Sequence, residues 1–268
     1  MRRGRRIRAA GLAVALVLTG AACGDDDVAT GARPTELTLA YDPLTGVEPA
    51  ALTTAIVDRL GSIGILVEGV DVDGEAGTVT VGLEDDRLAA LSGELLAQQG
   101  VIRIRPVLAV ITPDEAPAVA VTPADEDTAP AQPVVLVHRD REGAVDQTYQ
   151  LGPAIVDVDA IATASAEEDA AGTLGIRLVL EEAALPGFED AATICFGKAT
   201  TCPLGLLAVT IDGEVLAAPE VAQPSFDDGA IFITPQLDDA GIHRLANVLA
   251  QGPLPVALVP AAIRSAGG

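Results

Sequence analysis

The side chains that could carry out catalysis are few and poorly grouped. The chain has two histidines. His138 follows an apolar run and precedes a charged turn, whereas His243 lies four residues after Asp239 in a segment with helical periodicity. That spacing places Asp239 and His243 on one helix face, where they could form a weak acid–base or metal pair. A solvated helix face explains the same spacing more simply.

Motifs for other reactions are missing from the sequence. Ser165 and Ser225 lack the GxSxG turn of a hydrolase, and there is no Walker, GxGxxG, HExxH or EF-hand pattern. A hydrolase would require Asp239, His243 and another acid to meet in one pocket. We therefore expect no enzymatic activity, cofactor or metal site. Further acidic residues are plentiful but lack the spacing of metal ligands: Asp157, Asp159, Glu167, Glu168 and Asp169.

Cys195 and Cys202 lie seven positions apart in a glycine-containing loop. In an exported protein such a pair most often forms a disulfide. A disulfide that closes a loop this short would stabilise the fold by about 2 kcal/mol. The alternative, half of a metal site, lacks a nearby histidine. We expect a structural disulfide.

The N-terminal residues indicate export. An apolar run from Ala9 to Leu18 is shorter than the roughly 20 residues that span a bilayer, and small residues precede Cys23. Residues 1–22 are therefore predicted to be a signal peptide. The site resembles a bacterial lipobox, in which Cys23 is diacylated, although Gly20 stands where a branched aliphatic residue is usual. Ordinary secretion with cleavage near residue 22 is the alternative. The run follows a cluster of basic residues: Arg2, Arg3, Arg5, Arg6 and Arg8.

The composition excludes several classes of partner. The net charge of −23 repels nucleic acid and anionic lipid headgroups. Aromatic residues make up 2% of the chain, too few for a stacking platform that binds nucleic acid or sugar. An apolar groove for extended peptide can still be built from Leu, Ile and Val. After the signal peptide no apolar run approaches 18 residues, so no membrane helix is expected.

Residues 36–108 alternate strand and helix periodicity in the order βαββαβ. Residues 23–35 before them form a polar tether. The βαββαβ order is typical of a ferredoxin-like α+β unit, with helices on one sheet face. Pro106 is expected to end the closing strand. The predicted elements are strands 37–41, 65–72, 78–83 and 101–105, and helices that begin at Pro49 and near Leu88.

Residues 134–260 form a second α+β unit with antiparallel strands and a C-terminal helix. Residues 109–133, rich in proline and acids, form an extended linker before it, and 261–268 form a tail. Asp212-Gly213 between apolar strands predicts a tight hairpin with positive φ at the turn. The other predicted elements are strands 134–137, 174–180 and 230–234, a weak helix over 183–192, and a helix over 237–249 that Gly252 to Pro255 terminate.

Several of these patterns, in this order, resemble the first periplasmic domain of SecD, an accessory subunit of the bacterial preprotein translocase. Pro235 replaces a glycine that is usual in the family, and residues 82–85 lack its Pro-Gly pair. The matching pieces in the base are Asp58-Arg59-Leu60 and Ile104-Arg105-Pro106-Val107. Those in the head are Asp212-Gly213-x-Val215 with Ala218-Pro219, Gly229-x-Ile231-x-Ile233, Leu245-Ala246-x-x-Leu249 and Gly252-x-Leu254-Pro255.

The resemblance implies a function in protein export. It suggests a non-enzymatic lipoprotein on the extracytoplasmic face of the cell membrane, anchored through Cys23. Its expected partners are unfolded exported polypeptides and Sec translocon subunits. The family's proton-coupled motor uses charged residues within membrane helices, for which this sequence has no place. An envelope binding or structural lipoprotein with the same fold and no role in export is the alternative, because fold alone does not fix function.

Overall fold

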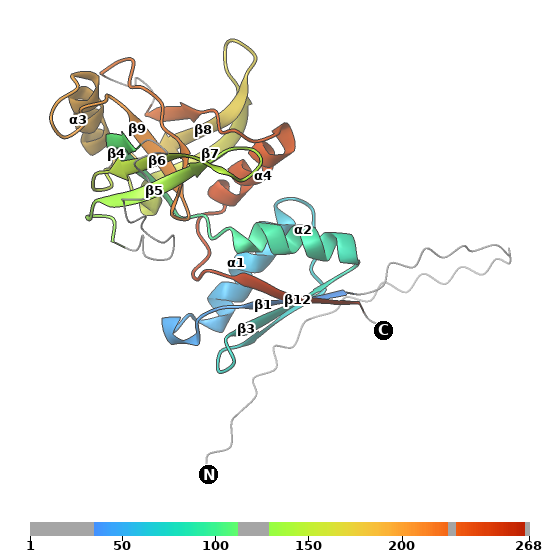
Figure 1. Ribbon diagram of the computed structural model, residues 1–268. Coiled ribbons are helices and arrows are strands. Elements are labelled where there is room, and N and C mark those ends of the chain that lie inside the picture. Colours follow the sequence, from blue (N-terminus) through green and yellow to red (C-terminus); the bar gives the residue numbers. More distant parts are fainter. Residues whose placement is uncertain (1–34, 112–128, 225–228, 266–268) are drawn as a thin grey trace, which may run out of the picture. The chain divides into compact units, whose positions relative to one another are not determined.

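The computed structural model describes residues 35–111, 129–224 and 229–265, which form a mixed α+β fold (Figure 1). The predicted fold class is therefore confirmed at that level. The signal peptide, Cys23 and most of the predicted tether lie outside the described residues, as do residues 112–128 of the predicted linker. None of the helices within these three ranges combines the length and the apolar composition that a membrane span requires.

The N-terminal strands form a four-stranded antiparallel sheet in the order β12-β1-β3-β2. Figure 1 shows β12, from the C-terminal end of the chain, running beside β1. The sheet therefore joins segments from opposite ends of the sequence. Its strands are β1 (Thr35–Ala40), β2 (Gly69–Asp73), β3 (Thr78–Leu83) and β12 (Val259–Ser265).

The prediction of which strand closes this sheet was wrong. Residues 101–105 were expected there, but they belong to β4 (Ile102–Ile111), which pairs with β6 and β9 in a different sheet. Pro106 does not end β4. Proline lacks a backbone N–H, so the strand loses one hydrogen-bond donor at this position, but the Pro106 carbonyl still accepts from Gly152 N at 2.9 Å. Alternation of apolar residues identifies a strand but not its partner, so the sequence could not exclude β12.

Two helices cover one face of the four-stranded sheet. α1 (Pro49–Gly61) begins with proline, whose fixed φ suits a first helical turn. α2 (Asp86–Ala97) begins after Asp85, whose carboxylate accepts from Leu88 N at 2.8 Å. Their apolar stripes pack on the inward side chains of β1 and β3 to form one core: Leu37, Leu39, Leu52, Ile56, Leu60, Val79, Val81, Leu83, Leu95 and Leu96. A 3-10 turn, η1 (Pro43–Thr45), connects β1 to α1.

Five strands close into a small barrel in the order β10-β5-β6-β4-β9. Asp212 and Gly213 form the two-residue turn between β9 and β10, with φ of 48° and 78°. The predicted tight hairpin is thus confirmed, since a primed turn needs positive φ at both positions. Apart from β4, the strands are β5 (Val134–Arg139), β6 (Val145–Leu151), β9 (Leu207–Ile211) and β10 (Glu214–Ala217).

A third sheet has the order β11-β8-β7 and packs with two helices. Asp238 caps the last helix by accepting from Gly241 N at 2.7 Å. The predicted helix over 237–249 and the strand over 174–180 are confirmed. The elements are η4 (Val158–Ala160), β7 (Ile161–Glu168), β8 (Leu174–Leu180), α3 (Leu185–Phe196), β11 (Ala230–Ile233) and α4 (Asp239–Ala250).

Candidate functional site

Cys195 and Cys202 form a disulfide, as predicted. The two residues are 1% and 0% exposed, so the bond is part of the core. It closes the turn that follows α3. After this turn, Gly205 accepts through its carbonyl from Val221 N at 2.9 Å. The disulfide therefore braces a loop that holds residues 219–223 in place.

Arg59, one of the predicted family-motif residues, is buried in α1 at 2% exposure. Its guanidinium donates to the carbonyl of Gln98, to that of Gln99 at 3.1 Å and to that of Gly252 at 2.6 Å. Gln99 also exchanges two hydrogen bonds with Leu254, at 2.8 and 3.2 Å. One cation therefore ties the segment after α2 to the segment after α4. We call these two segments, Gln98–Val101 and Gln251–Leu254, the junction.

Asp212 lies at the same junction. Its carboxylate accepts from Gly100 N at 2.9 Å and from Val101 N at 2.8 Å. Burial raises the pKa of Asp212 above its usual value, and the bonds from Gly100 and Val101 and the charge of Arg59 oppose that rise. Burial likewise lowers the pKa of Arg59 to about 10, against the pull of Asp212. The two charges thus offset part of each other's burial cost.

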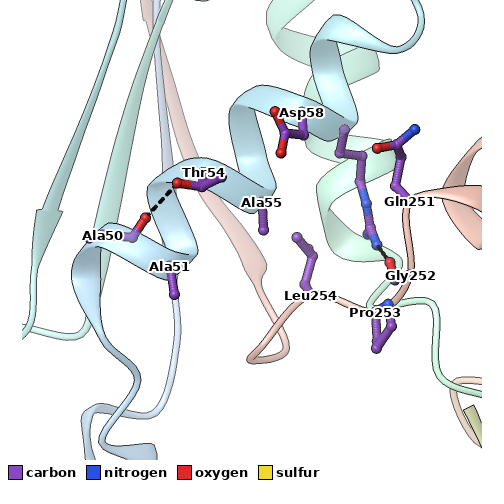
Figure 2. Close-up of a pocket in the computed structure, with 10 residues that line it drawn as sticks. Ala50, Ala51, Thr54, Ala55, Asp58, Gln251, Gly252, Pro253 and Leu254 are labelled. Atoms are coloured by element: carbon purple, nitrogen blue, oxygen red, sulfur yellow. Dashed lines mark hydrogen bonds between the residues drawn. The ribbon is translucent and has the colours of Figure 1, made fainter. Parts of the chain in front are cut away.

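A groove of about 500 Å³ lies beside the junction, between α1 and residues 251–254 (Figure 2). Small side chains on α1 leave this space open: Ala50, Ala51, Thr54 and Ala55. Arg59 also lines this groove and donates to the carbonyl of Gly252 at 2.6 Å. Because Arg59 and Gly252 bond to each other, we interpret these motif residues as structural.

Other motif residues stabilise the barrel and its neighbouring sheet. Arg105 is fully buried and donates to the carbonyls of Gln132 and Gly152, both at 2.9 Å. Gly229 has φ of 61°, and a Cβ there would lie 2.5 Å from a methyl group of Leu185. Its carbonyl accepts from Leu180 N at 3.1 Å. Both positions therefore depend on local geometry that other residue types would disturb.

The remaining motif residues differ in burial. Leu254 is 1% exposed and packs in the core beneath α1 and α2, whereas Pro255 is exposed. Pro219 follows β10, and its carbonyl accepts from Leu207 N at 3.1 Å. This bond places Pro219 at the wall of a cavity that β4, β9 and β11 also line.

An apolar cavity of about 250 Å³ lies among β4, β9, β11, α3 and the segment 219–223. We call it the apolar cavity. The segment 219–223 is held by Leu207 and Gly205 through backbone bonds and by an ion pair of 3.1 Å between Lys198 and Glu220. β11 lies at the end of its sheet and contributes Ile231 and Phe232. The apolar side chains that line the cavity are Ile104, Phe188, Leu207, Val209, Pro219, Val221, Ala222, Ile231 and Phe232.

The two histidines have different environments. His243 and Asp239 are both exposed on α4, as a solvated helix face predicts. His138 is 8% exposed, and its Nδ1 lies 2.6 Å from Asp146 Oδ1. The sequence interpretation missed this pair, although the alternation of Val134, Leu136 and His138 places the imidazole on the inward face of β5.

Tyr149 lies beside that pair and hydrogen-bonds to Gln147. Burial raises the pKa of Tyr149, and the charge of Asp146 raises it further. Among the residues that the structure describes, no three His, Cys, Asp or Glu side chains gather as a metal site would require.

No family model and no curated protein sequence matches this chain. Solved structures of SecDF do match. One is the crystal structure of SecDF in a super-membrane-facing form, with a TM-score of 0.58 and 21% identity over 88% of this chain and 30% of that chain. Another belongs to work on SecDF as a membrane component that enhances protein export. It has a TM-score of 0.57 and 22% identity over 86% of this chain and 99% of that chain.

The present chain therefore spans about 30% of the length of the first SecDF chain and nearly all of the second. At these identities the likeness establishes the fold. The resemblance predicted from the sequence motifs is confirmed at that level: this chain has the fold of a region of SecDF.

Proposed function

We propose that this chain is an extracytoplasmic, non-enzymatic accessory of protein export that binds segments of unfolded polypeptide. The apolar cavity is the observation that carries this proposal. Its lining of aliphatic and phenylalanine side chains suits an apolar side chain of a passing polypeptide. The SecDF fold, seen in a membrane component that enhances protein export, supports the same role.

The position of β11 supports an extended ligand. A strand at the end of a sheet can pair with an added chain through backbone hydrogen bonds, while pockets beside it select side chains. β11 has this position and lines the apolar cavity. Backbone pairing is independent of sequence, so an extended polypeptide of varied composition could be held there.

The order β12-β1-β3-β2 is that of a ferredoxin-like sheet if β12 is counted as the fourth strand. We therefore propose that residues 36–97 form a base which the C-terminal strand β12 completes. This base is shorter than the expected 36–108, because β4 pairs in the barrel and belongs to the head, whose other elements lie within residues 134–260. Anchoring through diacylated Cys23 would keep the protein at the membrane near Sec translocon subunits. Labelling with a radioactive fatty acid tests the anchor, with Cys23→Ala as the control.

Photocrosslinking tests polypeptide binding directly. A photoreactive residue placed at exposed Gln223, on the rim of the apolar cavity, should crosslink to a stalled export substrate. The same residue at exposed Glu75, in the β2–β3 turn, serves as the control. Equal yields at the two positions would contradict binding at the cavity.

A matched pair of variants tests the cavity with purified protein. Val221→Asp places a charge in the wall of the cavity, whereas Val57→Asp makes the same change at a residue that is 42% exposed. Only the first should weaken binding of a labelled unfolded peptide, by about tenfold or more, because a buried charge opposes apolar contact.

Normal export in a deletion strain with an altered envelope would favour the non-export role instead.

A further inference from the structure

A second cavity, of about 300 Å³, lies at the end of the barrel where β5 and β6 meet in a hairpin. We call it the barrel-end cavity. Its lining is mostly polar, and Asp146 supplies the one carboxylate among the described lining residues, which include no lysine or arginine. The other polar side chains that line it are His138, Gln147, Tyr149, Thr234 and Gln236.

A bulge directs Asp146 toward this cavity. His138 pairs with Gln147 and Arg139 pairs with Val145, so Asp146 is an extra residue in β6. A bulge of this kind re-aims a side chain that regular alternation would turn to the opposite face. His138 then fixes the carboxylate, because a contact of 2.6 Å between Nδ1 and Oδ1 requires a proton between the two atoms.

The fixed carboxylate keeps capacity for a further donor. A carboxylate offers about four acceptor positions, and the bond from His138 uses one of them. The Asp146 side chain is 35% exposed, so it is open to a ligand yet partly shielded from water. The rings of Tyr149 and Phe232 also line the cavity, and aromatic faces attract cations.

Arg139, the residue that follows His138 on the same hairpin, is bound elsewhere. Arg139 Nε lies 2.9 Å from a carboxylate oxygen of Glu214, and Arg139 also donates to the carbonyl of Gly143 at 3.0 Å. The barrel-end cavity thus presents one negative charge, two rings and several hydrogen-bond acceptors. The net charge of −23 adds an attractive field for cations.

We propose that the barrel-end cavity binds a basic side chain, arginine or lysine, of an extended polypeptide held by this protein. This inference rests on the proposed function and adds a specificity to it. Pro219 and Phe232 line both the barrel-end cavity and the apolar cavity, so the two share a wall. When a bound polypeptide places an apolar side chain in the apolar cavity, a neighbouring side chain of the same polypeptide therefore lies close to the barrel-end cavity.

Two labelled peptides that differ at one position test the proposal with the whole mature protein. One carries arginine beside an apolar cluster, and the other carries citrulline, a neutral residue of nearly the same shape. Fluorescence anisotropy should show that the arginine peptide binds about fivefold more tightly, the upper end for a partly exposed ion pair. Raising the salt concentration should shrink this preference, because screening weakens ion pairs.

Variants locate the preference. Asp146→Asn should abolish it, so that the arginine and citrulline peptides bind with equal affinity. Glu142→Gln removes the same charge from an exposed position on the same hairpin and should preserve the preference. His138→Gln should reduce the ratio of the two affinities without abolishing it, since His138 positions the carboxylate and does not itself bind the cation.

The outcomes separate this inference from the proposed function. If the unmodified protein binds both peptides equally well, the cation site is refuted while polypeptide binding stands. If it binds neither, the proposed function fails. If Glu142→Gln removes the preference as fully as Asp146→Asn does, the charge of the whole surface, and not the cavity, causes it, and the proposal is overturned.

Discussion

Arg59 and Asp212 bind neighbouring peptide groups of one short segment, Arg59 at the carbonyl oxygens and Asp212 at the N–H groups. Arg59 donates to the carbonyls of Gln98 and Gln99, and Asp212 accepts from the N–H groups of Gly100 and Val101. These residues are far apart in the sequence, yet each charge depends on the other for part of its compensation. The segment they hold is where the chain passes from α2 into the barrel strand β4.

Removing the Asp212 carboxylate should destabilise the fold strongly. Asp212→Ala leaves two backbone donors without their acceptor and leaves the buried guanidinium of Arg59 without its neighbouring negative charge, and such losses cost about 3 kcal/mol. Asp212→Asn keeps an acceptor and should cost less. Urea unfolding followed by circular dichroism measures both, with exposed Asp239→Asn as the reference. A loss for Asp212→Ala no greater than for the reference would contradict the structural role.

The coupling of the two charges can be measured by a double-mutant cycle. Arg59→Met and Asp212→Asn should each destabilise the protein, because each leaves the opposite charge buried without compensation. The double variant should be more stable than the sum of the single losses predicts, by about 1 kcal/mol. Additive losses would show that the charges act independently. The measurement is the free energy of unfolding of all four proteins under one condition.

Local patterns predicted much of the fold but not its connectivity. Strand alternation located β3 and β8, and the Asp212-Gly213 pair identified the β9–β10 hairpin, since these features depend on near neighbours in sequence. The partner of β4 depends on contacts between distant segments, so alternation could not distinguish β12 from β4 as the fourth strand. The fourth strand of that sheet is set by pairing between segments that are distant in the sequence.

The candidate sites show the same division. Arg59, Gly252 and Leu254 meet at one junction, but only the family resemblance, and no chemical pattern, had singled them out. The barrel-end cavity escaped prediction because Asp146 reaches it through a bulge. An irregularity of one residue changes which face a side chain occupies, and nothing in the alternation of β6 announces it.

Gly229 should tolerate no side chain. Gly229→Ala would place Cβ 2.5 Å from a Leu185 methyl group at φ of 61°, so steric overlap and backbone strain together should cost about 2 kcal/mol. Gly187→Ala provides the contrast, because no atom lies within 4 Å of its Cβ position and alanine favours the helix. The midpoint temperature of thermal unfolding should therefore fall for Gly229→Ala and rise for Gly187→Ala. A stabilising Gly229→Ala would contradict the packing of Leu185.

The phenol of Tyr149 reports on the charge of Asp146. Burial and the Asp146 charge both raise the pKa of Tyr149, and a raised phenol pKa means that the folded state loses stability as pH rises through that value. Asp146→Asn should lower the pKa of Tyr149 toward, but not to, its ordinary value, because burial remains. Absorbance at the tyrosinate band follows the titration, and Tyr149→Phe identifies the signal against Tyr41. If Asp146→Asn leaves the titration of Tyr149 unmoved, the carboxylate does not act on the barrel end, and the same change should then leave peptide selectivity untouched.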